Sequence, residues 1–259
     1  MAAEVRLAVG PIIGSEAGRQ ELSTGAGGDR TVEIDRLAEA TAMARFESLA
    51  AGGEAFSVLS EEVGHRDLGA EYPVVVMDPI DGSLNAKQGV PHYAIRLTLI
   101  DGPTVASVRA GYVMNLVNGE QFSAVRGGGA THDGKPLTTL RRTDSKGFEV
   151  LALESSPHSV LAAAPLLELA GKVRILGSMA ISIALVATGS FDIFCSPMRG
   201  RVFDMTASLL VLKEAGGVAT DMRGNPLDGL RVGLDVRTTL LAAVDGQAHA
   251  RALEALSVG

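Results

Sequence analysis

The stretch VVVMDPIDGSLN, residues 74–85, joins a run of β-branched apolar residues directly to two aspartates. The apolar run predicts a buried strand, with Asp78 and Asp81 at its end. An unpaired carboxylate is costly to bury, so these two side chains need a partner of opposite charge. Gly82 and Ser83 follow and predict a helix that begins at Ser83, where free backbone N–H groups would form an anion site beside the carboxylates.

The composition is that of a large folded chain without a nucleic-acid or membrane partner. The 259 residues are 46% hydrophobic and 20% charged, which suffices for one domain or two fused subdomains. A net charge of −7 argues against nucleic-acid binding, and no apolar stretch approaches the ~20 residues that cross a bilayer. The N-terminus shows no targeting pattern, which predicts a cytoplasmic protein. The single cysteine, Cys195, is expected to be a small buried apolar residue.

The first half of the chain predicts helices followed by an antiparallel meander. A helix of mixed polarity is expected over residues 4–22, which Gly10, Pro11 and Gly14 weaken or interrupt. A loop is expected over 23–31, and a second helix runs from Glu33 until glycines end it at 52–53. Alternating runs between residues 93 and 127 predict the strands of the meander. The separating segments carry turn chemistry, and the last of them is GGGATHDGKPL, residues 127–137.

The second half predicts strands that alternate with helices, which indicates a layered α/β arrangement. One helix is expected over residues 178–189 with Ser178 as its N-cap, and another opens at Asp204 and closes at Gly216. We therefore divide the chain into halves at residues 1–140 and 141–259. The strands expected in the second half are 148–155, 172–177, 191–196, 216–221 and 238–244.

Several further carboxylates stand at the edges of the expected elements. Glu61 ends a short strand, Asp204 begins a helix, and Asp35 lies in the first turn of another helix. Taken singly, Glu61 reads as a solvated charge, Asp204 as an N-cap, and Asp35 as a favourable charge at a helix start. A cluster of hard anionic oxygens without histidine or cysteine suits Mg²⁺ or Mn²⁺ better than zinc.

Metal ions beside a helix N-terminus would together bind the oxygens of a phosphate ester. A two-metal clamp lowers the pKa of a bound water and neutralises the leaving oxygen, so the reaction class expected is phosphomonoester hydrolysis by direct attack of water. The sequence contains no G-x-x-x-x-G-K-[ST] motif, which argues against nucleotide-driven phosphoryl transfer.

The motifs resemble those of the lithium-sensitive, magnesium-dependent sugar phosphatases, the superfamily of inositol monophosphatases and fructose-1,6-bisphosphatases. The resemblance spans nearly the whole chain, and it implies an α+β fold, a layered α/β/α/β/α sandwich with the metal site between two fused halves. It also implies a homodimer and a small sugar-phosphate substrate. The segments that carry it are SEE at 60–62, DPIDGSLN at 78–85, GGGATHDGKPL at 127–137, LGSMAISIALVATGSFD at 176–192 and VFDMTASLLVLKEAGGVATD at 202–221.

The resemblance implies a role for each matching residue, with two or three Mg²⁺ ions that Mn²⁺ can replace. The catalytic residues would be Ser83, which orients the attacking water, with Asp35 and Glu61. Gly82 and Ser83 would hold the phosphate, and Gly177 and Ser178 would line the sugar side. Serine stands where the superfamily usually has threonine. The metal ligands would be Glu61, Asp78, the carbonyl of Ile80, Asp81 and Asp204.

The substrate is expected to depend on two arginines before Asp204. Arg199 and Arg201 resemble the archaeal dual-specificity type, which hydrolyses both inositol phosphates and fructose 1,6-bisphosphate. An arginine beside the pocket could pair with a second phosphate through two hydrogen bonds. The plain alternative is that both arginines are solvated loop charges.

Two other functions stay open. One is a phosphatase for 3′-phosphoadenosine 5′-phosphate or histidinol phosphate, which the scarcity of aromatic residues (4%) disfavours because little is left to stack on a ring. The other is a non-catalytic regulatory protein that binds metal and phosphate. Binding alone does not require a hydroxyl such as that of Ser83 to position water, so the presence of Ser83 favours an enzyme.

Overall fold

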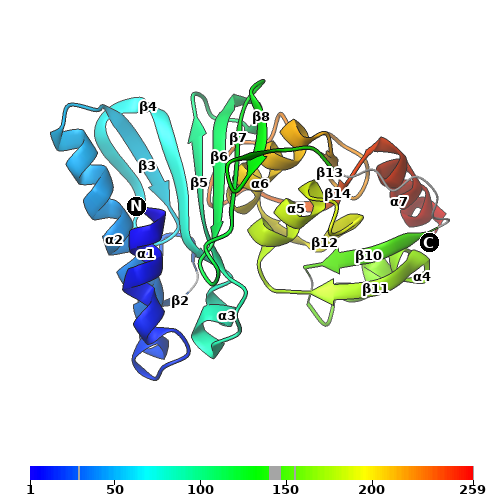
Figure 1. Cartoon of the computed structure of the whole chain (residues 1–259), viewed down its shortest axis with the longest axis horizontal. Coiled ribbons are helices and arrows are strands. Elements are labelled where there is room, and N and C mark those ends of the chain that lie inside the picture. Colours follow the sequence, from blue (N-terminus) through cyan, green and yellow to red (C-terminus); the bar gives the residue numbers. More distant parts are fainter. Residues whose placement is uncertain (29, 140–146, 155, 259) are drawn as a thin grey trace.

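The computed structural model describes residues 1–28, 30–139, 147–154 and 156–258. Helices and sheets form five layers in the order helix, sheet, helix, sheet, helix (Figure 1). The predicted α+β sandwich is thereby confirmed. The predicted boundary between the halves, at residues 140 and 141, lies outside the described residues.

Among the described residues, the helices other than α3 (Ser83–Gln88) supply the first, third and fifth layers. They are α1 (Ala2–Val9), α2 (Glu33–Ala51), α4 (Ala164–Leu169), α5 (Met179–Ala187), α6 (Val202–Ala215) and α7 (Gly246–Val258). The pair α1 and α2 covers the outer face of the first sheet, α5 and α6 lie between the two sheets, and α4 and α7 cover the second sheet (Figure 1). Among the described residues, no helix has the length and apolar character needed to cross a membrane.

The first sheet has the strand order β3-β4-β5-β6-β7-β8-β9. The long strand β4 folds back on itself, so that β3 pairs antiparallel with its first part and parallel with its last part. From β4 onward each neighbour is antiparallel, which confirms the predicted meander. The strands are β3 (Phe56–Ser60), β4 (Gly64–Asp81), β5 (Ala94–Ile100), β6 (Val108–Asn115), β7 (Gln121–Val125), β8 (Gly129–His132) and β9 (Lys135–Leu137).

The second sheet has the order β11-β10-β12-β14-β13 and confirms the strands expected in the second half. Its central strands are parallel, while β14 runs antiparallel to both of its neighbours. Cys195 lies in β12 and is fully buried, as expected. The strands are β10 (Phe148–Leu153), β11 (Ala170–Ile175), β12 (Ile193–Arg201), β13 (Val218–Thr220) and β14 (Arg237–Ala243).

Three local predictions are wrong. The helix over residues 4–22 ends at Val9, because Gly10 and Pro11 turn the chain into a 3-10 segment. The loop at 23–31 contains β2 (Arg30–Val32) and the end of β1 (Glu21–Thr24), which pair with each other. The turn segment 127–137 contains β8 and β9, since its glycines and Asp133 confine the left-handed turns to the strand ends.

The central helices bury nearly all of their surface because a sheet lies on each side. In α6 eleven of the fourteen residues are buried, and most of these are apolar, as a helix enclosed in a core requires. Gly216 ends α6 with a φ of 101°, as predicted, and the Ser178 hydroxyl caps α5 by accepting from the amide of Ile181 (3.4 Å). Helix α6 begins at Val202, two residues before the predicted start, so Asp204 is its third residue and not its N-cap.

Gly111 in β6 determines how closely α6 packs against the first sheet. A Cβ atom on Gly111 of β6 would lie 2.6 Å from the carbonyl oxygen of Ala207 in α6 and 3.0 Å from its Cα. Both contacts are with backbone, which cannot move without moving the helix. The close approach of β6 and α6 therefore requires glycine at position 111.

Replacing Gly111 with alanine is expected to destabilise the protein by about 1–3 kcal/mol, because α6 must shift away from the sheet. Urea unfolding followed by circular dichroism measures the change. Gly10→Ala is the control, since Gly10 has a helical φ of −47° and open space around it. Equal stabilities for the Gly111 and Gly10 variants would contradict the role given to Gly111.

Candidate active site

Three of the predicted carboxylates converge between the two sheets. Glu61 follows β3, Asp78 lies near the end of β4, and Asp204 comes from the first turn of α6. Each offers one oxygen, and these three oxygens all lie within 4.8 Å of one another. The structure thus brings together acids that are up to 143 positions apart in the chain, at a spacing a single cation could bridge.

Asp81 is not one of these three acids, and it contacts the start of α5. One of its oxygens, Oδ2, accepts hydrogen bonds from the Ser178 hydroxyl and from the amide of Ala180 (2.9 Å). Asp81 therefore ties the end of β4 to the N-terminus of α5, where the helix dipole favours a negative charge. This contact places Ser178 beside Asp81.

The backbone of Ile80 is held by its neighbours in the turn after β4. The Ile80 amide donates to Asp78 Oδ1 (2.9 Å), and the Ile80 carbonyl accepts from the Ser83 hydroxyl (2.9 Å). A carbonyl oxygen has two lone pairs, so a hydrogen bond from Ser83 leaves one for a further contact. Ser83 begins α3, as predicted.

Asp35 is the third residue of α2, and only one of its two carboxylate oxygens has a hydrogen-bond partner among the described residues. Its Oδ2 accepts from the Val32 amide (3.2 Å), which caps the helix. Its Oδ1 is buried and has no hydrogen-bond partner among the described residues. Burial raises the pKa of Asp35 to about 6, and the Val32 amide and the Ser83 hydroxyl act against this shift. The interpretation of Asp35 as a favourable charge at a helix start accounts for Oδ2, which caps α2. It does not account for the buried Oδ1.

Glycines allow the start of α3 to meet the second half of the chain. Gly82 has a φ of 93°, and a Cβ atom there would lie 3.0 Å from the carbonyl oxygen of Gly177. Asn85 holds this junction, since its Nδ2 donates to the carbonyls of Leu176 (2.6 Å) and His92 (2.7 Å). The predicted phosphate and sugar residues are thus neighbours. The sequence prediction had no role for Asn85.

The two predicted substrate arginines lie in different environments. Arg199 is exposed, and its Nη2 donates to the carbonyl of Arg237 (2.8 Å). Arg201 is buried, and it pairs with Glu61 Oε1 through Nη2 (2.6 Å) and with Asp204 Oδ2 through Nε (2.9 Å). The interpretation as solvated charges is therefore wrong for Arg201, because its guanidinium lies among the carboxylates.

A second arginine in the centre, Arg96, was missed by the sequence prediction. It is fully buried in β5, with Nη2 on Asp204 Oδ1 (2.6 Å), Nη1 on the carbonyl of Phe203 (2.5 Å) and Nε 3.5 Å from Asp78 Oδ2. The signal was present in the apolar run YAIRLTLI, because a charged side chain in a buried strand needs an ion-pair partner.

The electrostatics of the centre favour a cation. Burial raises the pKa of Glu61 to about 7, although Arg201 opposes the shift. Burial and repulsion by Glu61 raise the pKa of Asp78, and Arg96 opposes this. Burial also raises the pKa of Asp81. An all-oxygen donor set whose negative charges repel one another in a partly desolvated site fits a hard divalent cation such as Mg²⁺.

Two buried glutamates near the centre were also missed. Burial, together with repulsion by Asp81, raises the pKa of Glu154 to about 7, and its buried Oε2 has no hydrogen-bond partner among the described residues. Burial raises the pKa of Glu39 in α2 to about 7 as well, while the Ser60 hydroxyl, which donates to Glu39 Oε2 (2.6 Å), opposes the shift. Neither residue belongs to a motif, so only their burial reveals them.

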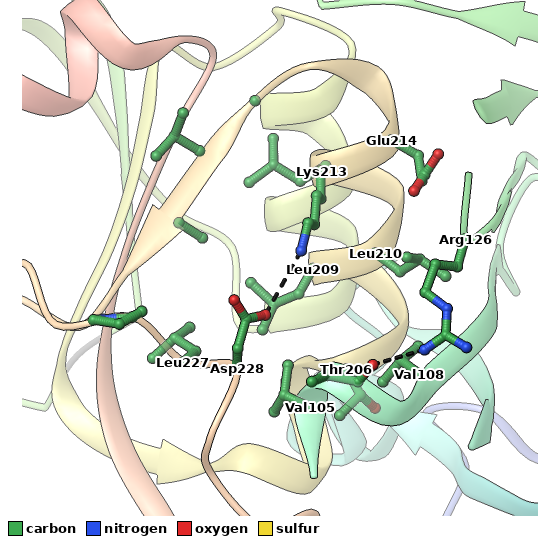
Figure 2. Close-up of a pocket in the computed structure, with 16 residues that line it drawn as sticks. Val105, Val108, Arg126, Thr206, Leu209, Leu210, Lys213, Glu214, Leu227 and Asp228 are labelled. Carbon is green, nitrogen blue, oxygen red and sulfur yellow. Dashed lines mark hydrogen bonds and ion pairs between the residues drawn. The ribbon is translucent and has the colours of Figure 1, made fainter. Parts of the chain in front are cut away.

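A separate cavity of about 250 Å³ lies along the other end of α6 (Figure 2). Apolar side chains such as Val105, Leu209 and Leu227 line much of it. Its acids are already paired: Asp228 with Lys213 (3.6 Å), and Glu214 with the backbone amides of residues 127 and 129. The acidic centre, and not this cavity, has the chemistry predicted from the sequence.

Comparison with known proteins agrees with the fold and the acidic centre. The model of the inositol monophosphatase family matches residues 1–257. A fructose-1,6-bisphosphatase/inositol-1-monophosphatase of Methanothermobacter thermautotrophicus is 33% identical over 274 residues, covering 100% of this chain and 94% of that protein. One of Thermococcus kodakarensis is 29% identical, covering 98% of this chain and 94% of that protein. A solved structure described as an inositol monophosphatase-fructose 1,6-bisphosphatase is 25% identical with a TM-score of 0.83, covering 98% of this chain and 96% of that one.

Fold, motifs and acidic centre together define a sugar phosphatase of the layered α+β type. The chain belongs to the inositol monophosphatase family. The superfamily and the resemblance to the archaeal dual-specificity type, predicted from the motifs, are confirmed.

The raised pKa of Glu39 predicts a pH-dependent stability. The carboxyl of Glu39 titrates near 4.5 when unfolded and near 7 when folded, so between these values the folded protein holds the extra proton. Its contribution to the free energy of unfolding therefore falls as pH rises from 4.5 through 7. As the pH rises from 5 to 8, the free energy of unfolding should decrease less in Glu39→Gln than in the original chain. The two decreases should differ by on the order of 3 kcal/mol.

Urea unfolding at both pH values, with a chelator present, measures this difference. Glu47→Gln is the matched control, because Glu47 lies on the same helix and is exposed. If Glu39→Gln followed the same pH dependence as Glu47→Gln, the buried proton assigned to Glu39 would be wrong.

Proposed function

We propose that the chain is a Mg²⁺-dependent phosphomonoesterase that hydrolyses inositol 1-phosphate, fructose 1,6-bisphosphate or both by direct attack of water. The observation that carries the proposal is the convergence of Glu61, Asp78 and Asp204 beside the start of α3. The names of the relatives from Methanothermobacter and Thermococcus support the substrate class. Two or three Mg²⁺ ions would occupy the centre during turnover, and Mn²⁺ would replace them.

The proposed ligands come from both halves of the chain. They are Glu61, Asp78, the carbonyl of Ile80, Asp81 and Asp204. When bound, the ions would supply positive charge to the phosphate oxygens and lower the pKa of a nearby water. The protein contributes a fixed geometry, since Asp78 is held by the Ile80 amide and Asp81 by the start of α5.

Ser83 is the residue we assign to orienting the attacking water. Its hydroxyl donates to the Ile80 carbonyl in this structure, and its effect on the pKa of Asp35 marks that carboxyl as a second neighbour. Asp35 Oδ1 is a buried acceptor without a partner among the described residues, so it is available to accept a hydrogen bond from Ser83. With its hydroxyl donating a hydrogen bond to Asp35 and keeping its proton, the Ser83 oxygen would accept a hydrogen bond from the water and fix its direction of attack.

The substrate would lie across the junction of the two halves. The free N–H groups of Gly82 and Ser83 would bind the phosphate, because the first turn of a helix leaves these donors unsatisfied. Gly177 and Ser178 would line the sugar side, next to this turn. Asn85, which joins α3 to residue 176, would keep the two sides in register.

The proposal includes a homodimer in the cytoplasm. Strand β11 is the edge of the second sheet, and it exposes Val173 (37%) and Ile175 (57%). An uncovered edge strand with apolar side chains favours pairing with another chain. Light scattering of the purified protein measures whether it pairs.

Asp81→Asn is expected to reduce phosphate release with Mg²⁺ by about a hundredfold or more, because a metal ligand loses its charge. The fold should persist, since an amide oxygen at this position still accepts from Ser178 and Ala180. Phosphate release from inositol 1-phosphate, with circular dichroism as a check of folding, measures both. Asp228→Asn, an exposed acid paired with Lys213, is the control. Near-full activity of folded Asp81→Asn would rule out the proposed ligand set.

Arg199→Ala is expected to lower kcat/KM for fructose 1,6-bisphosphate about tenfold and to leave inositol 1-phosphate unchanged, because only the bisphosphate has a second phosphate to pair with an exposed arginine. Arg201→Ala should change both substrates alike, since Arg201 contacts Glu61 and Asp204. Steady-state kinetics on the two substrates, with 3′-phosphoadenosine 5′-phosphate as a third, makes the comparison. If Arg199→Ala lowered kcat/KM equally for all three substrates, or for none of them, Arg199 would have no role in substrate specificity.

A further inference from the structure

Two arginines share the acidic centre, and each holds a different oxygen of the same carboxylate. Arg96 binds Asp204 Oδ1 (2.6 Å), and Arg201 binds Asp204 Oδ2 (2.9 Å). Both guanidiniums lie near the ring of Phe203, at 4.4 Å and 5.9 Å from its centroid. Asp204 is thus fully engaged by cations that belong to the chain itself.

Arg96 is held at both of its terminal nitrogens, whereas its buried Nε has no hydrogen-bond partner among the described residues. It lies in β5 between β4 and β6, opposite Asp78 in the register of the sheet, and its side chain has no exposed surface. Its Nη1 donates to the carbonyl of Phe203, and the Phe203 ring lies under its guanidinium. An arginine stays protonated, so moving it would require breaking a buried ion pair, a hydrogen bond and a cation–π contact together.

Arg201 occupies a different kind of position. It is the N-cap residue of α6, and a small part of its side chain (9%) reaches solvent. It bridges Glu61 from the first half and Asp204 from the second, which are two of the three acids that a metal would join.

The balance of charge agrees with this difference. The four proposed ligand carboxylates bring four negative charges when ionised, and the two arginines return two positive ones. A bound divalent cation would compete with Arg201 for two carboxylates, those of Glu61 and Asp204. It would not compete with Arg96 for Asp204 Oδ1 if Arg96 stays in place.

We propose that Arg96 is a permanent cation of the centre and that Arg201 is a displaceable one. On binding of Mg²⁺, Arg201 would give up its contacts with Glu61 and Asp204, while Arg96 would keep its contact with Asp204 Oδ1. Arg96 is therefore a positioning residue that holds the centre in shape without metal. The inference rests on the proposed assignment of Glu61, Asp78 and Asp204 as metal ligands.

The test follows the two guanidinium groups directly. Metal-free protein labelled with ¹⁵N is titrated with Mg²⁺, and the Nε–H signals of Arg96 and Arg201 are recorded by NMR after through-bond assignment. We expect the Arg201 signal to lose its protection from exchange with water at the same Mg²⁺ concentration at which calorimetry reports binding. The Arg96 signal should remain protected at saturation.

A variant tests the competition independently. Arg201→Gln should bind Mg²⁺ about tenfold more tightly in calorimetry, because the resident cation no longer has to be displaced. Arg109→Gln is the matched control and should change the affinity less than twofold, since Arg109 is an exposed arginine of β6 that pairs with Asp101. The NMR experiment uses the unchanged chain and so does not depend on the folding of a variant.

The outcomes separate this inference from the proposed function. Absence of Mg²⁺ binding in calorimetry refutes the metal centre itself. If Mg²⁺ binds and the Arg201 signal is unchanged, or the Arg96 signal loses its protection, the proposed difference between the two arginines is wrong. Either result is still compatible with the proposed metal centre. An Arg201→Gln variant with unchanged affinity likewise overturns the competition.

Discussion

The contact of Arg96 with Asp78, Asp204 and the Phe203 carbonyl is the interaction on which the centre depends. It joins β5 of the first sheet to the first turn of α6, and so it fixes the helix start relative to the strand ends. Without a cation at this place, buried carboxylates from three elements would repel one another in a medium that screens them poorly. The internal guanidinium lets these acids be assembled before any metal is present.

Raised carboxyl pKa values are the electrostatic cost of this assembly. Asp35, Glu39, Glu61, Asp78, Asp81 and Glu154 all hold their protons to higher pH than free carboxyl groups. In each case burial is the first cause, because the layers on both sides exclude water from the space between them. Such groups destabilise the fold and mark the functional region, as expected where a site is built for charge and not for stability.

Much of the architecture could be predicted because its signals are local. The meander, the alternating second half and the starts of α3 and α5 follow from periodicity, turn residues and caps, and the structure confirms them. The errors occurred where local signals compete. The helix expected over residues 4–22 stopped at Val9 because Gly10 and Pro11 outweighed a weak pattern, and the short strands β1, β2, β8 and β9 depend on pairing with neighbours that propensity does not reveal.

The sequence by itself determined the family, the layered fold and the carboxylates that gather beside α3, since motif order and spacing are properties of the chain. Tertiary structure alone decided how those carboxylates are balanced. From the sequence, Arg96 only interrupts an apolar strand, and Arg201 is a substrate arginine or a loop charge. The sheet register and the close approach of α6 to β6 set both beside Asp204. Charge pairing across more than a hundred residues is a matter of distance in space, which no local pattern encodes.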